Sequence, residues 1–187
     1  SWLAQRESRI ADLLGLCIED SADGVLLHLA VGESKYVAAD TASDAKRGSR
    51  AQLLATLTTL REALFGDPGR LDRDLWLARL ADLLIDAVIP PDQTALLERA
   101  RDEIRKGTVR ISLRGYSHVF IHSADAGQPD TQSMRAAVEI STPAIAFQEV
   151  FDRTALRRIA EAYVLERDPT EVRESIDVDK PWDLRDA

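Results

Sequence analysis

Two apolar runs flank a short polar turn near the start of the sequence. Residues 10–18 are mostly apolar, Ser-Ala-Asp-Gly follows at 21–24, and a second apolar run begins directly afterwards. Side chains alternate between the two faces of a strand, so the second run presents one apolar face: Val25, Leu27, Leu29 and Val31. The pattern predicts a β-hairpin. If it closes symmetrically around Ala22 and Asp23, Leu14 faces Val31 and Ile18 faces Leu27.

The same register brings charged residues together where the apolar face ends. Asp12 falls opposite Glu33, and Lys35, two residues further on, shares the face of Glu33. The hairpin therefore predicts a cluster of Asp12, Glu33 and Lys35.

Three helices are predicted between this hairpin and the next strand. Leucines at helical spacing predict a helix over residues 45–65, ended by Gly66 and Pro68. A second is expected over 71–88, ended by two prolines, and Pro91 can open a third through Ile104, closed by Gly107.

The remaining sequence predicts further strands and one helix. Residues 109–113 and 119–121 alternate in polarity around 114–117, which contain Gly115, and predict a second hairpin or two short strands. Residues 138–140 suit a strand or a helix end, 144–150 a strand, and 153–166 a helix. We expect an α/β fold with a mixed central sheet flanked by helices. One domain would span 1–167, with 66–107 as a helical insertion and 168–187 as a tail.

An Asp on one arm and Glu-x-Lys on the other resembles the signature of the PD-(D/E)XK nuclease superfamily, over about residues 10–65. Ala11 replaces the proline that often precedes the Asp, and Glu7 is the one acidic residue ahead of the hairpin for the helix that usually opens the family's fold. The resemblance implies a restriction-endonuclease-like fold and DNA cleavage with Mg²⁺ or Mn²⁺.

The same resemblance implies a role for each residue of the cluster. Asp12, Glu33 and the backbone carbonyl of Ser34 would hold the metal ion, whose oxygen ligands suit Mg²⁺ or Mn²⁺. Lys35 would orient or deprotonate the attacking water and stabilise developing charge. In the layout of this family, Arg50 and Gln52 of the following helix would face the site.

Charge and composition qualify this interpretation. The formal charge of −8 argues against a free-standing nucleic-acid binder, because binding to phosphate favours a positive surface. Basic residues do cluster locally, and with Gln52 we expect Lys46, Arg47 and Arg50 to contact DNA. The single cysteine and the absence of a secretory pattern suggest a cytoplasmic protein with no membrane span.

A setting in a larger protein is also expected. The chain opens with Ser1, which suggests a piece of a longer polypeptide. The Gly-Glu-Ser-Lys-Tyr stretch at 32–36 is similar to nuclease domains carried by, or partnered with, ATPases and helicases in bacterial restriction and phage defence, including phosphorothioation-dependent restriction.

Several alternatives stay open. Asp12, Glu33 and Lys35 can form a purely structural ion pair across the sheet, or a catalytically degenerate nuclease-like domain can serve as a protein-interaction module. The Glu-Ser-Lys stretch can also be incidental in a small-molecule or regulatory domain. Asp20 and Asp23 are fallback metal ligands. A zinc pair of His118 and His122 is disfavoured, since four residues along a strand span about 13 Å.

Overall fold

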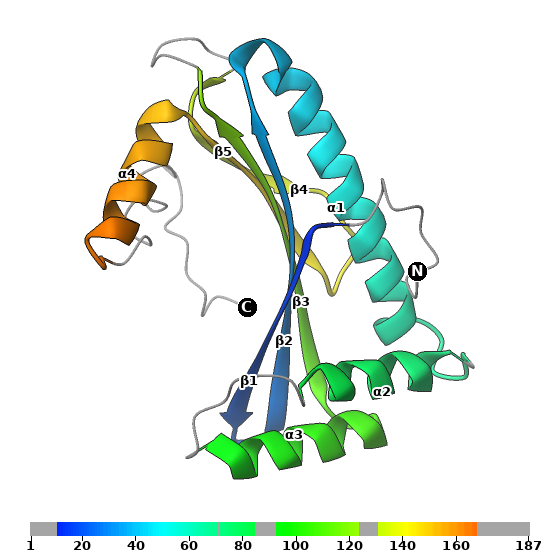
Figure 1. Ribbon diagram of the computed structural model, residues 1–187. Helices are drawn as coiled ribbons and strands as arrows, with labels where there is room; N and C mark the ends of the chain where they lie inside the picture. Colours follow the sequence, from blue (N-terminus) through cyan, green and yellow to red (C-terminus); the bar gives the residue numbers. More distant parts are fainter. Residues whose placement is uncertain (1–10, 71, 85–92, 124–130, 168–187) are drawn as a thin grey trace.

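The computed structural model of the protein describes residues 11–70, 72–84, 93–123 and 131–167. Five strands form one mixed sheet in the order β1-β2-β3-β5-β4. The strands are β1 (Leu13–Ser21), β2 (Gly24–Val37), β3 (Arg110–Ile121), β4 (Met134–Val138) and β5 (Ile145–Phe151). The helices are α1 (Ala42–Phe65), α2 (Arg73–Leu83), α3 (Thr94–Lys106) and α4 (Arg153–Val164), and a 3₁₀ turn at Ala39–Thr41 precedes α1. The expected α/β class with a mixed, helix-flanked sheet is confirmed (Figure 1).

The first hairpin closes in the predicted register. Leu14 pairs with Val31 and Ile18 with Leu27, and Ser21 pairs with Gly24 across the turn. Gly24 has φ of +112°, a conformation that a glycine adopts without strain. The hydroxyl of Ser21 donates to the Gly24 carbonyl over 2.6 Å. The turn chemistry therefore fixes the register, and the register decides which side chains share a face.

The prediction of a second hairpin or two short strands is wrong. Residues 110–121 form the single strand β3, which runs parallel to β2 from Leu26↔Arg110 to Val37↔Ile121. Gly115 does not make a turn: a Cβ there would lie 2.4 Å from Cδ1 of Leu57, so glycine lets α1 pack closely on the strand. Strand β5 is parallel to β3, as the apolar run at 144–150 allows, and β4 pairs antiparallel at the edge.

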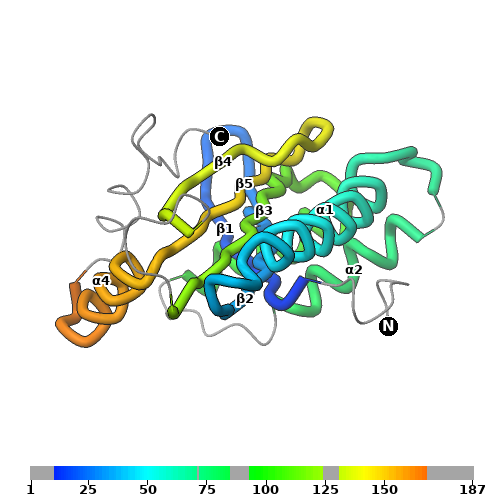
Figure 2. The backbone as a smooth tube through the Cα atoms, turned by 90° about the horizontal axis from the view of Figure 1, so that it is seen from above, coloured from blue at the N-terminus to red at the C-terminus, as the bar shows by residue number. Residues whose placement is uncertain are grey.

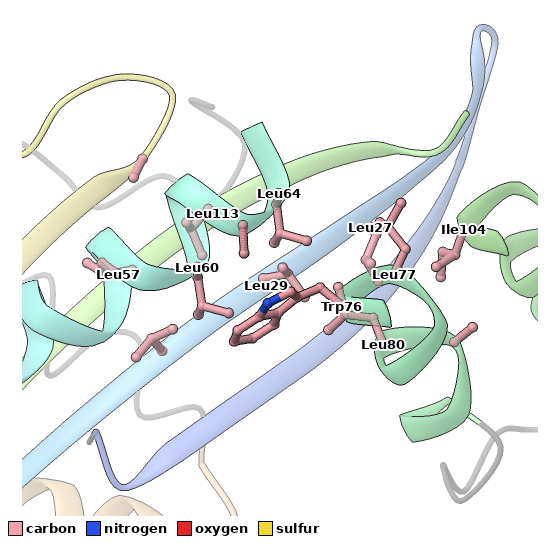
Figure 3. Packing of buried hydrophobic residues seen from close by; sticks show 14 of the residues in the cluster. Leu27, Leu29, Leu57, Leu60, Leu64, Trp76, Leu77, Leu80, Ile104 and Leu113 are labelled. Atoms are coloured by element: carbon pink, nitrogen blue, oxygen red, sulfur yellow. The ribbon is translucent and has the colours of Figure 1, made fainter. Parts of the chain in front are cut away.

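Helix α1 lies along β2 and β3 on the face that carries Leu27, Leu29 and Val31. Helices α2 and α3 pack into the same core further along β2; Figure 3 shows Trp76 of α2 among leucines of α1 and the sheet. The largest fully buried side chains of this core are Leu27, Leu29, Leu53, Leu57, Leu60, Leu77, Leu80, Ile104 and Leu113. The alternating buried residues of β2 thus pack against leucines that recur at helical spacing along one side of α1.

Helix α4 lies on the other side of the sheet from α1 (Figure 1). It follows β5 after Asp152, whose side chain accepts a hydrogen bond of 2.8 Å from the amide of Ala155 and caps the helix. Viewed from above, α4 lies at the end of β5, while α1 runs along the sheet (Figure 2). Within the described residues, no helix is long and apolar enough to cross a membrane. The predicted tail, 168–187, lies outside the described residues, as does Glu7.

Candidate functional site

Asp12 stands immediately before β1 and is bonded to the neighbouring strand. Its Oδ2 accepts a hydrogen bond of 3.0 Å from the backbone amide of Ser34. The N–H and C=O groups of one strand residue point to the same side, so the Ser34 carbonyl also points toward the side of Asp12. The carboxylate and the carbonyl named as ligands by the sequence are therefore adjacent.

Glu33 and Lys35 form an ion pair on the face of β2 that α1 covers. Lys35 Nζ lies 2.6 Å from Oε1 of Glu33, and the Glu33 side chain is 0% exposed whereas that of Lys35 is 33% exposed. Within the described part of the chain, Oε2 of Glu33 has no hydrogen-bond partner. Buried carboxylate oxygens are normally paired, because desolvation without a partner is costly. Glu33 thus has an unsatisfied oxygen beside a cation that reaches solvent.

The cross-strand neighbours of Glu33 continue as a row of buried polar side chains. The register places Ser117 beside Glu33 and Gln148 beside Ser117. Gln148 Nε2 donates to Ser117 Oγ over 3.0 Å, and Ser117 Oγ lies 2.7 Å from Oγ of Ser49 on α1. The first half of α1 is therefore held to the sheet by hydrogen bonds, while its second half packs through leucines. We call Ser49, Ser117 and Gln148 the polar seam.

Thr56 attaches the start of β1 to α1. The backbone amide of Ala11 donates to Thr56 Oγ1 over 2.9 Å, and the Thr56 hydroxyl donates to the carbonyl of Gln52 over 3.1 Å. Asp12 is thereby anchored on both sides, through Ala11 to α1 and through its own carboxylate to β2. The sequence analysis did not identify Thr56, Ser49 and Ser117. The one sequence feature that could have indicated them is that each is a polar residue at a position where the apolar pattern of its helix or strand predicts burial.

Three of the four residues proposed for DNA contact gather in one groove. A cavity of about 390 Å³ lies beside α1 at the β5 and β4 side, lined by Ser43, Lys46, Arg47, Arg50, Ala51, Leu54, Met134 and Gln148. Arg50 donates to Oε1 of Gln148 over 2.8 Å, and Gln148 donates to the carbonyl of Lys46 over 2.8 Å. Gln52 does not line it. We call this cavity the basic groove.

The fallback ligands lie elsewhere. Asp20 forms an ion pair with Arg99 of α3, and Asp23 lies 3.5 Å from Arg110. Both are at the turn end of the hairpin, whereas Asp12 and Glu33 are at its open end. The two histidines are not a pair: His118 Nε2 lies 3.0 Å from Glu149 Oε2, and His122 stacks on Tyr36. The structure therefore brings neither set to the Asp12 and Glu33 site.

The oxygen donors of Asp12, Glu33 and Ser34 are of the types that a hard divalent cation takes. Two carboxylates and a carbonyl are oxygen donors, and Mg²⁺ is commonly held by one or two carboxylates with water completing its shell. The unsatisfied Oε2 of Glu33 supplies the observation that favours a missing partner. No group of three or more His, Cys, Asp and Glu side chains that could hold a metal occurs among the residues that the structure describes. Protein side chains alone would leave such an ion partly hydrated.

Comparisons with known proteins give no relative. No protein-family model, no curated protein and no solved structure matches this chain. Function is consequently inferred from the arrangement of Asp12, Glu33, Lys35 and their neighbours.

Proposed function

We propose that the protein is the endonuclease module of a larger bacterial defence or restriction protein, hydrolysing phosphodiesters of DNA in the cytoplasm with Mg²⁺ or Mn²⁺. The observation that carries this proposal is the fully buried, half-satisfied carboxylate of Glu33 beside the partly exposed ammonium of Lys35. Burying the Glu33 carboxylate is costly, because it loses its hydration while its partner Lys35 stays partly in water. A functional requirement accounts for its retention.

Asp12, Glu33 and the Ser34 carbonyl would hold the cation, which when bound neutralises the scissile phosphate and acidifies a water molecule. Lys35 has one oxygen of Glu33 within 2.6 Å and remains 33% exposed, so its ammonium is fixed yet accessible to a substrate. It would orient the attacking water and stabilise the negative charge that grows on phosphate oxygens in the transition state. Asp12 is held for this task by the Ser34 amide.

The electrostatics of the surface support a phosphate substrate locally, though the whole chain carries −8. Lys46, Arg47 and Arg50 line one groove, and Arg50 is attached to Gln148 of the polar seam. Strands in a sheet are about 4.8 Å apart, so the backbone of Gln148, two strands from Glu33, lies roughly 10 Å from it. The basic groove and the carboxylates are near enough to meet one DNA molecule.

A plasmid-nicking assay tests the proposal. Supercoiled DNA is incubated at low ionic strength with Mn²⁺ and with Mg²⁺, using wild type, Glu33→Gln and Lys35→Ala. We expect wild type to nick the plasmid and both variants to lose nicking by a factor of about 100 or more, in the range that a missing acid–base or electrostatic group costs. Lys106→Ala is the matched control, since Lys106 is an exposed lysine of α3 paired with Asp102. Equal nicking activity of Lys35→Ala and Lys106→Ala would contradict the catalytic role proposed for Lys35.

A second function, a protein-interaction module, has its own support. Leu13 is 65% exposed and Tyr36 is 67% exposed, and both belong to the sheet face opposite α1. An ATPase or helicase partner, or another part of the same polypeptide, would cover such apolar groups. Under this alternative Tyr36→Ser abolishes co-elution with that partner in size-exclusion chromatography while Lys35→Ala does not. If no DNA is cut and Tyr36→Ser breaks the complex, this alternative replaces the nuclease.

A further inference from the structure

We infer that the basic groove binds one unpaired, phosphate-bearing nucleotide of a DNA strand, with its phosphate on the cations and its base against the aliphatic wall. This inference rests on the proposed function for the identity of the ligand as DNA. It adds that the protein engages single-stranded or locally opened DNA rather than an intact duplex alone.

The two sides of the basic groove differ in chemistry. Lys46, Arg47 and Arg50 supply positive charge, although Arg47 also forms an ion pair with the exposed Asp44. Ala51, Leu54 and Met134 supply an apolar surface. A bare phosphate needs the cations alone, and the backbone of a duplex presents few apolar groups to a protein. A nucleotide has both an anionic and a flat apolar part, and extruded bases are held against apolar side chains in this way. The groove volume of about 390 Å³ falls at the lower end of small-ligand sites.

Arg50 is placed for phosphate recognition by the polar seam. Its guanidinium donates to Oε1 of Gln148, which is 1% exposed and is itself held by its bonds to Ser117 and the Lys46 carbonyl. One of the five N–H donors of an arginine is used in the bond to Gln148, and the fork geometry of the others suits a phosphate. Gln148 thereby acts as a positioning residue. This positioning role explains why a buried polar side chain stands in β5 at this place.

The distance between the basic groove and Glu33 decides which part of a bound DNA strand would reach the carboxylates. The row from Glu33 through Ser117 to Gln148 connects the carboxylate cluster with Arg50 across two strand spacings, roughly 10 Å. Ser43 at the start of α1 also lines the groove, so the ligand would lie beside the first turns of the helix. When one nucleotide of a DNA strand occupies the groove, the phosphates of the adjacent nucleotides would therefore lie close to the candidate metal ligands.

Fluorescence anisotropy in EDTA tests this inference without cleavage. A labelled oligothymidylate and a labelled hairpin duplex of equal length are titrated with wild type, Arg50→Gln, Arg47→Gln and Met134→Ser. Arg157→Gln on α4 is the matched control, because it removes one charge from an exposed arginine outside the groove. We expect Arg50→Gln to weaken oligothymidylate binding about tenfold and Arg47→Gln about threefold, with Arg157→Gln near wild type, since each lost phosphate contact lowers affinity by such factors. Met134→Ser should weaken the single strand more than the duplex.

Three results would contradict the inference. Equal weakening by Arg50→Gln and Arg157→Gln would mean that binding follows total charge. Equal effects of Met134→Ser on both DNA forms would mean that the groove contacts only the phosphates of a duplex. Undetectable binding of oligothymidylate by wild type would mean that the groove binds no nucleotide. Glu33→Gln separates this outcome from the failure of the proposed function. A wild type that cuts no DNA, but binds oligothymidylate as tightly as Glu33→Gln and more tightly than Arg50→Gln, disproves the nuclease and keeps the nucleotide groove.

Discussion

Lys35 Nζ lies 2.6 Å from Oε1 of Glu33, and the two side chains differ in their access to solvent, the lysine being one-third exposed and the glutamate fully buried. Removing the lysine alone therefore leaves a buried charge without its partner. Replacing both side chains by uncharged ones leaves no buried charge. The loss of stability in such a double variant should therefore be smaller than the sum of the losses in the two single variants.

This asymmetry predicts coupled effects on stability. Lys35→Met should lower the free energy of unfolding by about 2 kcal/mol, allowing for the partial exposure of the lysine. The double variant Glu33→Gln/Lys35→Met should lose less than the sum of the two single variants. Urea unfolding of the four proteins measures the cycle. Additive losses would show that the two side chains do not stabilise each other.

Divalent cations should stabilise the fold through Glu33. Adding Mn²⁺ or Mg²⁺ at 100 times its dissociation constant should raise stability by about 2.7 kcal/mol, since binding only to the folded state shifts the unfolding equilibrium. Differential scanning fluorimetry would show the corresponding rise in Tm for wild type and none for Glu33→Gln. Asp23→Asn is the control, because Asp23 is an exposed carboxylate at the far end of the hairpin. An undiminished rise in Glu33→Gln would place the cation elsewhere.

Two glycines near α1 should respond to alanine with opposite signs. Gly115→Ala would put a Cβ 2.4 Å from Leu57 and 3.0 Å from Leu53, so we expect a loss of about 1–3 kcal/mol. Gly48 lies within α1 with nothing within 4 Å of the added Cβ, and Gly48→Ala should gain up to about 1 kcal/mol. Thermal unfolding of both variants provides the comparison. A stabilised Gly115→Ala would mean that α1 does not press on β3 at this point.

Thr56→Val should loosen the start of β1. The change keeps the shape of the side chain but removes the acceptor for the Ala11 amide, at a cost of about 1 kcal/mol. Thr59→Val is the control, because it removes a hydroxyl that donates within α1, to the Ala55 carbonyl over 3.0 Å. Hydrogen exchange should show faster exchange of the amides around Ala11 and Asp12 in Thr56→Val and not in Thr59→Val. Unchanged protection would show that Asp12 is held by Ser34 alone.

The first hairpin and α1 were predictable from the sequence because their signals are local. A polar turn with Gly24 sets the register, and leucines repeat along α1 at helical spacing. Strand β3 was not predictable as one strand, because a glycine between two alternating segments is typical of a turn. Only the structure shows that Gly115 makes room for Leu57 of α1. Residues 138–140 were predicted as a strand or a helix end, but the strand there is Met134–Val138, and antiparallel pairing with β5 determines its bounds.

For the candidate site, sequence reasoning supplied the residues of the hairpin and not their support. Asp12, Ser34, Glu33 and Lys35 follow from the register of two adjacent strands. Ser117 and Gln148 join the site only through parallel pairing with distant segments, which no short sequence pattern encodes. Arg50 was named and lines the basic groove, whereas Gln52 was named and does not.

The pairing of β2 with its two neighbours also has a consequence for the order of folding. The hairpin of β1 and β2 closes through a two-residue turn, a local event that takes microseconds in small systems, so the bond from Ser34 to Asp12 is available early. Pairing of β2 with β3 requires Leu26 to meet Arg110 after three intervening helices, and such distant contacts form slowly. A nascent chain that ends before β3 would contain Asp12, Glu33 and Lys35 with Glu33 still hydrated. Glu33 would lose its hydration only when β3 docks and Ser117 comes to lie beside it.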